Sequence, residues 1–259
     1  MRYSRRTAIF HLATLVLTAA GCATRPLARI MAPVASPLAR LMRGNARFVR
    51  GQMAYADSTP ARRAALTKSQ HPFAVIVACS DSRSSPAIIF DQGLGHLFVV
   101  RVAGEVVDDA AAESVQYAVE HLHVHLVMVL GHDDCGAVKA ALNPGPANAE
   151  LSAIIKQMEP AIKEAESENA PGRLNCAINL NAQLQAEKLA RLPALEKHIR
   201  AGELKIVAAR YKLATGRVLL LPDNASFTQS LLRLHRAPHC SPAVGLTTCG
   251  WCGKISGHP

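Results

Sequence analysis

The stretch FAVIVACSDSR, residues 73 to 83, joins an apolar run to a short polar sequence. The run is continuous and rich in β-branched residues, as expected for a strand that is buried on both faces. A thiol, a carboxylate and a guanidinium then occupy alternate positions, at Cys79, Asp81 and Arg83. Because side chains alternate along an extended chain, these three groups are predicted to project to the same side. The stretch therefore predicts a central strand that ends in a cluster of reactive side chains.

Similar apolar runs recur along the chain and alternate with helical patterns. Strands are predicted over 73–79, 96–102 and 125–132, and helices over 85–91, 109–122 and 135–142. This order predicts an α/β fold with a mainly parallel central β-sheet flanked by helices. The remainder is predicted to form helices over 150–168, 175–192 and 193–201 and a β-hairpin made by residues 204–213 and 217–222.

Composition sets the class of protein. The chain has 259 residues and 49% hydrophobic content, enough for one sizeable domain with a buried core. Its formal charge is +10, and removal of Arg2, Arg5 and Arg6 with an N-terminal signal would leave 10 − 3 = +7. No basic stripe is interleaved with aromatic residues, so nucleic-acid binding is not predicted.

The first residues are predicted to be an export signal rather than part of the fold. Residues 1–22 combine a basic start, an apolar run that is short for a membrane span, and small residues before Cys22. The end of this segment resembles a lipobox, which leaves three alternatives: a lipoprotein signal, an ordinary signal that is cleaved nearby, or a transmembrane anchor. The prediction is an exported protein, either periplasmic or lipid-anchored, with possible membrane attachment through Cys22.

The regions that flank the predicted domain differ from it in composition. Residues 23–36 are rich in Pro and Ala and are predicted to be a linker, residues 37–222 the domain, and residues 223–259 a weakly ordered tail. The tail contains Cys240, Cys249 and Cys252. A disulfide between Cys249 and Cys252, a second zinc site that includes His239, a redox role, and no function at all remain alternatives for this tail.

A second cluster of metal-binding residue types follows the third predicted strand. The sequence GHDDCG, residues 131 to 136, places His132 at the end of that strand and Cys135 three residues later. Functional sites in open α/β sheets lie at the carboxyl ends of strands, where Cys79 also lies. Thiolate sulfur and imidazole nitrogen are ligands of Zn²⁺, and three protein ligands leave a fourth position for water. The sequence therefore predicts a zinc site formed by Cys79, His132 and Cys135.

The Asp81–Arg83 pair is predicted to control the fourth position. A bidentate ion pair with Arg83 would keep Asp81 away from the metal and leave room for water. If that pair breaks, Asp81 can become the fourth ligand and close the site.

The motifs together resemble those of the β-class carbonic anhydrases. The resemblance extends from RGNARF near residue 44 to RVLLLP near residue 222, and its specific motifs are CSDSR, IIFDQGLG, LFVVRVAG, QYAVEHL, GHDDCGAVKAAL and ELKIVAARYKLATGRV. It implies zinc ligation by Cys79, His132 and Cys135, catalytic assistance by Asp81 and Arg83, and contact of Gln70 with substrate across a subunit boundary. It also implies a homodimer or tetramer.

The activity implied by this resemblance is the reversible hydration of carbon dioxide to bicarbonate and a proton by zinc-bound hydroxide. A closed, non-catalytic zinc protein and a related hydrolase of carbon disulfide or carbonyl sulfide remain alternatives. The chain departs from the usual family pattern at Glu105, where Asn is common, and at Ser84 to Ala87, where Val-Pro-Pro-Glu is frequent. Neither departure is expected to touch a metal ligand.

Three further histidines, His121, His123 and His125, alternate where a predicted helix gives way to the third strand. Such spacing gathers imidazoles in some zinc enzymes. These residues lie at the opposite end of that strand from His132, and they are predicted to be mostly exposed to solvent, with a second metal site as the alternative.

Overall fold

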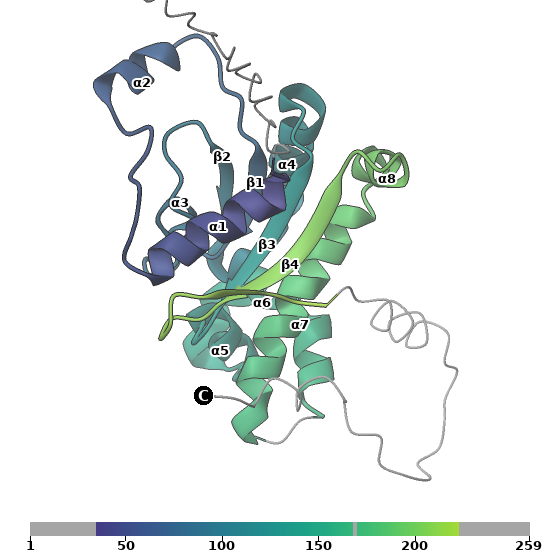
Figure 1. Ribbon diagram of the computed structural model, residues 1–259. Coiled ribbons are helices and arrows are strands. Elements are labelled where there is room, and N and C mark those ends of the chain that lie inside the picture. Colours follow the sequence, from purple (N-terminus) through teal and green to yellow (C-terminus); the bar gives the residue numbers. More distant parts are fainter. Residues whose placement is uncertain (1–34, 168–169, 223–259) are drawn as a thin grey trace, which may run out of the picture. The chain divides into compact units, whose positions relative to one another are not determined.

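A five-stranded sheet forms the centre of the domain. The computed structural model describes residues 35–167 and 170–222. The strands lie in the order β2-β1-β3-β4-β5, and β5 alone is antiparallel to its neighbour (Figure 1). Their bounds are Ala74–Ala78 for β1, Leu97–Arg101 for β2, Leu126–His132 for β3, Lys205–Tyr211 for β4 and Val218–Leu220 for β5. The predicted α/β fold with a mainly parallel sheet is confirmed.

The two inner strands explain why the apolar runs are continuous. Every residue of β1 and of β3 is buried. Within β1, Val75 and Val77 belong to one hydrophobic cluster, whereas Ile76 and its neighbours Ala74 and Ala78 belong to another on the opposite face. Both faces of β1 therefore exclude water, which stabilises the fold by about 1.5–3 kcal/mol for each fully buried large side chain.

Helices cover both faces of the sheet. On one face, α1 (Pro37–Val49) and α3 (Pro86–Ile89) contribute Leu41 and Ile89 to the cluster that contains Ile76; Figure 1 shows α1 crossing in front of the strands. On the other face, the cluster with Val75 receives side chains from α4 (Asp109–Leu122), α7 (Ala170–Ala190) and α8 (Pro193–Arg200). A three-layer arrangement results, with helices on both sides of the sheet.

The remaining helical segments surround the end of the sheet where β1 and β3 terminate, or lie in loops. They are α2 (Pro60–Ala65), η1 (Ala103–Glu105), α5 (Gly136–Leu142), η2 (Pro146–Leu151) and α6 (Ser152–Ala165). The sequence did not predict α2, because it has no buried residue and hence no apolar periodicity. The helix predicted over 150–168 is η2 followed by α6, and α7 begins at Ala170 rather than at residue 175.

Several predictions fall on residues outside this description. The export signal, Cys22, most of the linker and the tail cysteines lie there. Among the helices of residues 35–167 and 170–222, none has the length and apolar character needed to cross a membrane.

Gly44 allows α1 to approach α3 closely, and its replacement is expected to destabilise the fold. A Cβ atom at Gly44 would lie 1.8 Å from the carbonyl oxygen of Phe90, a backbone atom that cannot move aside freely. Gly44→Ala is therefore expected to lower the free energy of unfolding by about 1–3 kcal/mol or more, although alanine favours a helix. Thermal unfolding measures the effect. Gly136→Ala in α5, whose added Cβ meets nothing within 4 Å, is the control; equal stability of both variants would contradict the prediction.

Candidate metal centre

The candidate site lies where two neighbouring parallel strands end. Cys79 directly follows β1, His132 is the last residue of β3, and Cys135 caps the start of α5. Strands β1 and β3 pair in a register that sets Ala78 opposite Leu130, so the residues that follow them emerge side by side. Sheet topology thus brings together residues that are far apart in the chain.

The three side chains meet at distances suited to a shared ion. One ligand atom from each of Cys79, His132 and Cys135 lies within 4.8 Å of the other two, and the two sulfur atoms are 4.0 Å apart. All three residues are buried. Within residues 35–167 and 170–222, no other group of three such donors is this close.

His132 has the lone pair of its Nε2 atom available for a metal ion. The Nδ1 atom of His132 lies 2.8 Å from the carbonyl oxygen of Asp133, which can only accept a hydrogen bond, so the ring proton is on Nδ1. The Nε2 atom is buried and has no hydrogen-bond partner within the structure. A buried nitrogen lone pair beside two sulfurs is costly unless it binds a cation.

The donor set fits Zn²⁺. Two sulfur ligands at about 2.3 Å on a tetrahedral ion lie about 3.8 Å apart, close to the observed Sγ–Sγ distance of 4.0 Å. Cysteine and histidine are the ligands that this ion prefers. The three residues could therefore hold zinc and leave one position open.

Proton sharing between the thiols supports the same conclusion. A hydrogen bond with Cys135 lowers the pKa of the Cys79 thiol to about 4, and the same contact together with burial raises the pKa of Cys135. Burial lowers the pKa of His132, but the neighbouring Cys79 thiolate outweighs it and the pKa is raised overall. A divalent cation bound between the donors would favour the deprotonated forms of Cys135 and His132.

Asp81 and Arg83 form the bidentate pair that the sequence predicted, but not on an extended chain. The N–H of Ser84 donates to the carbonyl oxygen of Asp81 at 3.0 Å, so residues 81–84 form a turn. Arg83 reaches back across this turn: Nε lies 2.9 Å from Oδ1 and Nη2 lies 2.7 Å from Oδ2 of Asp81. The prediction that residues 79–83 form an extended segment with alternating side chains was therefore wrong, because the chain reverses immediately after β1.

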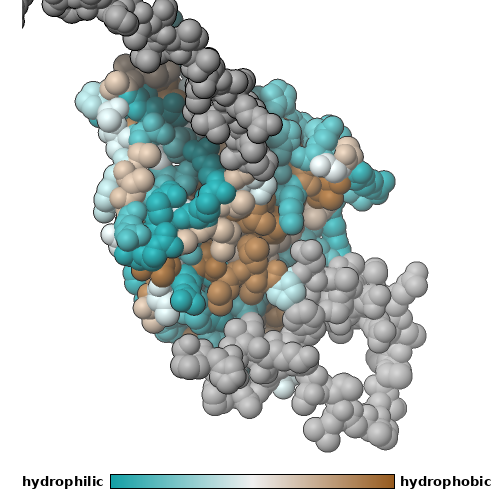
Figure 2. All heavy atoms as spheres, in the orientation of Figure 1, coloured by the Kyte–Doolittle hydropathy of each residue, from teal (hydrophilic) through white to brown (hydrophobic). Residues whose placement is uncertain are grey.

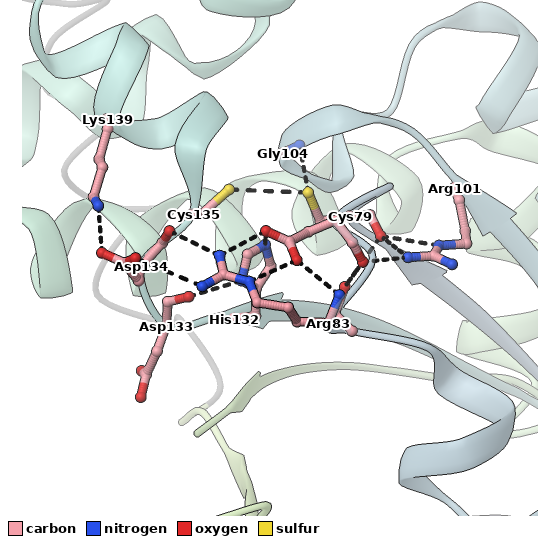
Figure 3. Close-up of polar contacts among 11 residues, drawn as sticks. Cys79, Arg83, Arg101, Gly104, His132, Asp133, Asp134, Cys135 and Lys139 are labelled. Carbon is pink, nitrogen blue, oxygen red and sulfur yellow. Dashed lines mark hydrogen bonds and ion pairs between the residues drawn. The ribbon is translucent and has the colours of Figure 1, made fainter. Parts of the chain in front are cut away.

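The ion pair keeps the carboxylate charged and close to the candidate metal site. Hydrogen bonds from Arg83 hold the pKa of Asp81 well below its usual range. One carboxylate oxygen, Oδ2, lies 3.9 Å from Nε2 of His132. Arg83 also approaches Asp134, which in turn pairs with Lys139, so that Figure 3 shows a chain of charged groups along the mouth of the site.

Comparison with known sequences identifies the family. A profile of the family described as carbonic anhydrase matches residues 74–218, which include all five residues of this site. The carbonic anhydrase of Mycolicibacterium smegmatis is 40% identical over 195 residues, which cover 73% of this chain and 95% of that protein. The chain belongs to the carbonic anhydrase family.

Solved structures confirm the β class that the motifs resemble. The β-carbonic anhydrase CcaA superposes with a TM-score of 0.59 at 26% identity, over 72% of this chain and 88% of that one. Two tetrameric β-carbonic anhydrases from the filamentous ascomycete Sordaria macrospora share the fold, with a TM-score of 0.58 at 24% identity over 63% of this chain and 87% of theirs. The carbonic anhydrase activity predicted from the motifs is thereby supported.

In this β-carbonic anhydrase two residues for which the sequence analysis expected no role in the site hold the turn after β1. Arg101, at the end of β2, donates to the carbonyl oxygens of Cys79 and Asp81 at 2.7–3.0 Å (Figure 3). The hydroxyl of Ser84 donates to the same two carbonyls at 3.3 and 2.9 Å. The expectation that residue 84 would not touch a candidate ligand is thus wrong, because the turn folds Ser84 back under Cys79.

The other departure from the family pattern lies behind the site. The N–H of Gly104 donates to Sγ of Cys79 at 3.2 Å, and Glu105 follows it with its side chain fully buried. Asn181 of α7 donates to the carbonyl oxygen of Gly104 at 2.8 Å and to Oε1 of Glu105 at 2.9 Å. The side-chain oxygen Oδ1 of Asn181 accepts a hydrogen bond from Nε2 of Gln185. The side-chain oxygen of Gln185 in turn accepts from the N–H of Val107. A buried polar network therefore fixes the loop that supports Cys79.

Glu105 is expected to make folding stability depend on pH. Burial raises its pKa to about 8 from about 4.5 for an exposed glutamate, and its Oε2 atom is buried without a hydrogen-bond partner. Between these two values the folded protein keeps a proton that the unfolded chain has lost, so stability falls as pH rises from about 4.5 to 8. Glu105→Gln removes the titrating group and should flatten this fall. Urea unfolding of both proteins across that range measures it; parallel curves would contradict the prediction.

Gln70 is the one predicted site residue that lies apart from the others. It is exposed in the loop before β1, whereas Cys79 follows the other end of that strand. Five strand residues span roughly 16 Å. Within the described part of the chain, Gln70 makes no contact with Asp81, Arg83 or the three candidate ligands.

Proposed function

We propose that this β-carbonic anhydrase catalyses the reversible hydration of carbon dioxide to bicarbonate and a proton, with Zn²⁺ held by Cys79, His132 and Cys135. The observation that carries the proposal is the buried convergence of two sulfurs and an unpartnered imidazole nitrogen within 4.8 Å. Zinc bound there would act as a Lewis acid and lower the pKa of water, so that hydroxide is available near neutral pH.

The neighbouring charged pair is proposed to orient the reacting water. Asp81 is ionised at neutral pH because Arg83 donates to both of its oxygens, so it can only accept hydrogen bonds. Its position 3.9 Å from Nε2 of His132 allows it to accept a hydrogen bond from a water molecule beside the three ligands. Arg83 has a second role, since it prevents the carboxylate from binding the metal itself and supports an open site over a closed, structural one.

Hydration by zinc-quantified protein, followed by stopped flow, tests the proposal. We expect rapid hydration with about one zinc per chain and inhibition by small anions that compete for the metal. Zinc binding without turnover would instead support the closed, non-catalytic alternative. Turnover of carbon disulfide or carbonyl sulfide in preference to carbon dioxide would support the related hydrolase.

Hydration activity is expected to rise toward alkaline pH. Two thiolates and one imidazole offset the charge of Zn²⁺ more fully than three imidazoles do. Water at this site should therefore be less acidic than at the three-histidine site of other carbonic anhydrases, where a pKa of about 7 is typical. The same stopped-flow assay from about pH 6 to pH 9 measures the profile. A flat profile over that range would contradict the proposed ligand set.

Self-association, as a homodimer or tetramer, is proposed to complete the site. Gln70 and Cys79 lie beyond opposite ends of β1, so the amide of Gln70 would reach substrate from a second subunit. The edge strand β2 exposes Val99, and β5 exposes Leu220 at 45%; Figure 2 shows hydrophobic residues gathered on the face where β4 and β5 lie. Unpaired edges and exposed apolar residues favour association. Analytical ultracentrifugation tests it, and a monomer at assay concentration would contradict it.

Export to the cell envelope is proposed from the sequence of residues 1–22. Cell fractionation tests export, and mass analysis of the mature N-terminus distinguishes a lipid on Cys22 from ordinary cleavage. A cytoplasmic protein with an intact N-terminus would contradict the proposal.

A further inference from the structure

A second group of imidazoles lies at the end of the sheet opposite the metal centre, where β3 and β4 begin. His123, His125 and His198 line one pocket of about 70 Å³ together with Glu203. His121 belongs to the same sequence triplet, but it lies on α4 with its ring 5.1 Å from that of Tyr117. The third imidazole of this pocket is therefore that of His198, and not that of His121. The alternating sequence pattern did not connect His198 to the other two histidines.

Two turns bring Glu203 between two of these histidines. Helix α8 ends before Gly202, whose φ of +73° reverses the chain, and the N–H of Glu203 then donates to the carbonyl oxygen of His198 at 2.9 Å. Two residues later, the N–H of Lys205 donates to the carbonyl oxygen of His125 at 3.0 Å, where β4 joins β3. Backbone hydrogen bonds thus fix Glu203 against both neighbours.

Glu203 holds both imidazoles by the same ring nitrogen. Its backbone carbonyl oxygen accepts from Nδ1 of His125 at 2.9 Å, and its carboxylate oxygen Oε2 accepts from Nδ1 of His198 at 2.9 Å. With the proton on Nδ1, the lone pair of each ring lies on Nε2. Histidines that bind metals are held in this way, with the second nitrogen donating to a carbonyl or a carboxylate.

His123 occupies a backbone position where glycine would be less strained. It caps the end of α4 with φ 54° and ψ 43°, in the left-handed region. A residue with a Cβ atom costs about 1–2 kcal/mol more than glycine in this conformation. This left-handed position is occupied by a histidine whose ring adds a third imidazole to the lining of the pocket.

We propose that this pocket binds a divalent transition-metal ion of the class that prefers imidazole, such as Zn²⁺, Ni²⁺ or Cu²⁺, through Nε2 of His125 and His198 and the ring of His123. The ion would join the start of β3 to the end of α8. Among the described residues only Cys79, His132 and Cys135 have three donor atoms already within 4.8 Å of one another. The three imidazoles, of which His123 and His125 are exposed and His198 is partly buried, must therefore shift closer together while Glu203 keeps its two Nδ1 contacts, so we expect this site to be weaker than the Cys–His–Cys site.

Ni²⁺ titration of the zinc-loaded full chain, by calorimetry and thermal unfolding, tests the proposal. We expect a Ni²⁺-dependent rise in Tm that is lost when His125→Ala and His198→Ala are combined and kept in His121→Ala, the matched control outside the pocket. Glu203→Gln keeps the backbone carbonyl and should weaken Ni²⁺ binding by about 10- to 100-fold. Hydration activity is not the readout, so the outcome is independent of the proposed catalytic role.

His123→Gly tests whether a loss of Ni²⁺ binding is caused by loss of the imidazole and not by misfolding. Glycine suits the left-handed position, so this variant should fold at least as stably as the parent and still bind Ni²⁺ more weakly. The proposal is overturned if the parent chain shows no Ni²⁺-dependent rise in Tm, or if the double variant shows the same rise and affinity as the parent. It is also overturned if His121→Ala loses binding to the same extent.

Discussion

Arg83→Ala is expected to keep its zinc and to lose nearly all hydration activity, by a factor of at least about 100. In the parent, the guanidinium donates to both oxygens of Asp81 and fixes the carboxylate beside the three candidate ligands. Without it, Asp81 is free to rotate toward the metal, since Oδ2 is already 3.9 Å from Nε2 of His132. A fourth protein ligand would then occupy the position needed by water. Zinc content by mass spectrometry and stopped-flow hydration measure the two expectations together.

Lys139→Ala is the matched control for this experiment. Lys139 is a cation at the same mouth of the site and pairs with Asp134, which Arg83 also approaches, but it makes no contact with Asp81 in the described structure. Loss of general positive charge would affect both variants alike, whereas loss of the Asp81 anchor affects only Arg83→Ala. An Arg83→Ala protein that sheds its metal, or that stays fully active, would contradict the proposed roles.

Cys135→Ser is expected to remove zinc and to reduce hydration to background. The change replaces a sulfur ligand with a hydroxyl that remains protonated, so only one thiolate and one imidazole would remain for the ion. Metal content after dialysis, together with hydration, measures the effect.

Cys176→Ser provides a control of the same chemistry. Cys176 is as buried as Cys135 and belongs to the same hydrophobic cluster, but it is not one of the three converging donors. Both substitutions place a hydroxyl in an apolar environment, so a difference between them reports metal ligation rather than packing. Retention of one zinc per chain by Cys135→Ser, or equal loss in Cys176→Ser, would contradict the ligand assignment.

The parts of the fold that the sequence predicts well are those set by local pattern. The runs that became β1 and β3 are apolar throughout because both faces of each strand are covered, and their ends follow from the polar residues Cys79 and His132. Since the carboxyl ends of adjacent parallel strands meet, the grouping of Cys79, His132 and Cys135 could also be expected.

The residues that support Cys79 and the turn after β1 could not be predicted, because their positions depend on tertiary contacts. Asn181 lies 77 residues from Gly104 and meets it only when α7 packs against the end of the sheet. Arg101 reaches the turn after β1 because β2 pairs with β1 in a register that sets Ala78 opposite Arg101. The turn at Asp81 was also missed, since alternation is informative only while the chain stays extended.

The separation of the two sulfurs along the chain bears on how the protein matures. Cys79 and Cys135 are 56 positions apart, and they become neighbours only through the pairing of β1 with β3. During synthesis from the amino end, the first thiol emerges long before the second, and no high-affinity ion site exists until that pairing forms. Metal binding by the proposed zinc site would therefore be a late event, which stabilises an assembled sheet rather than nucleating it.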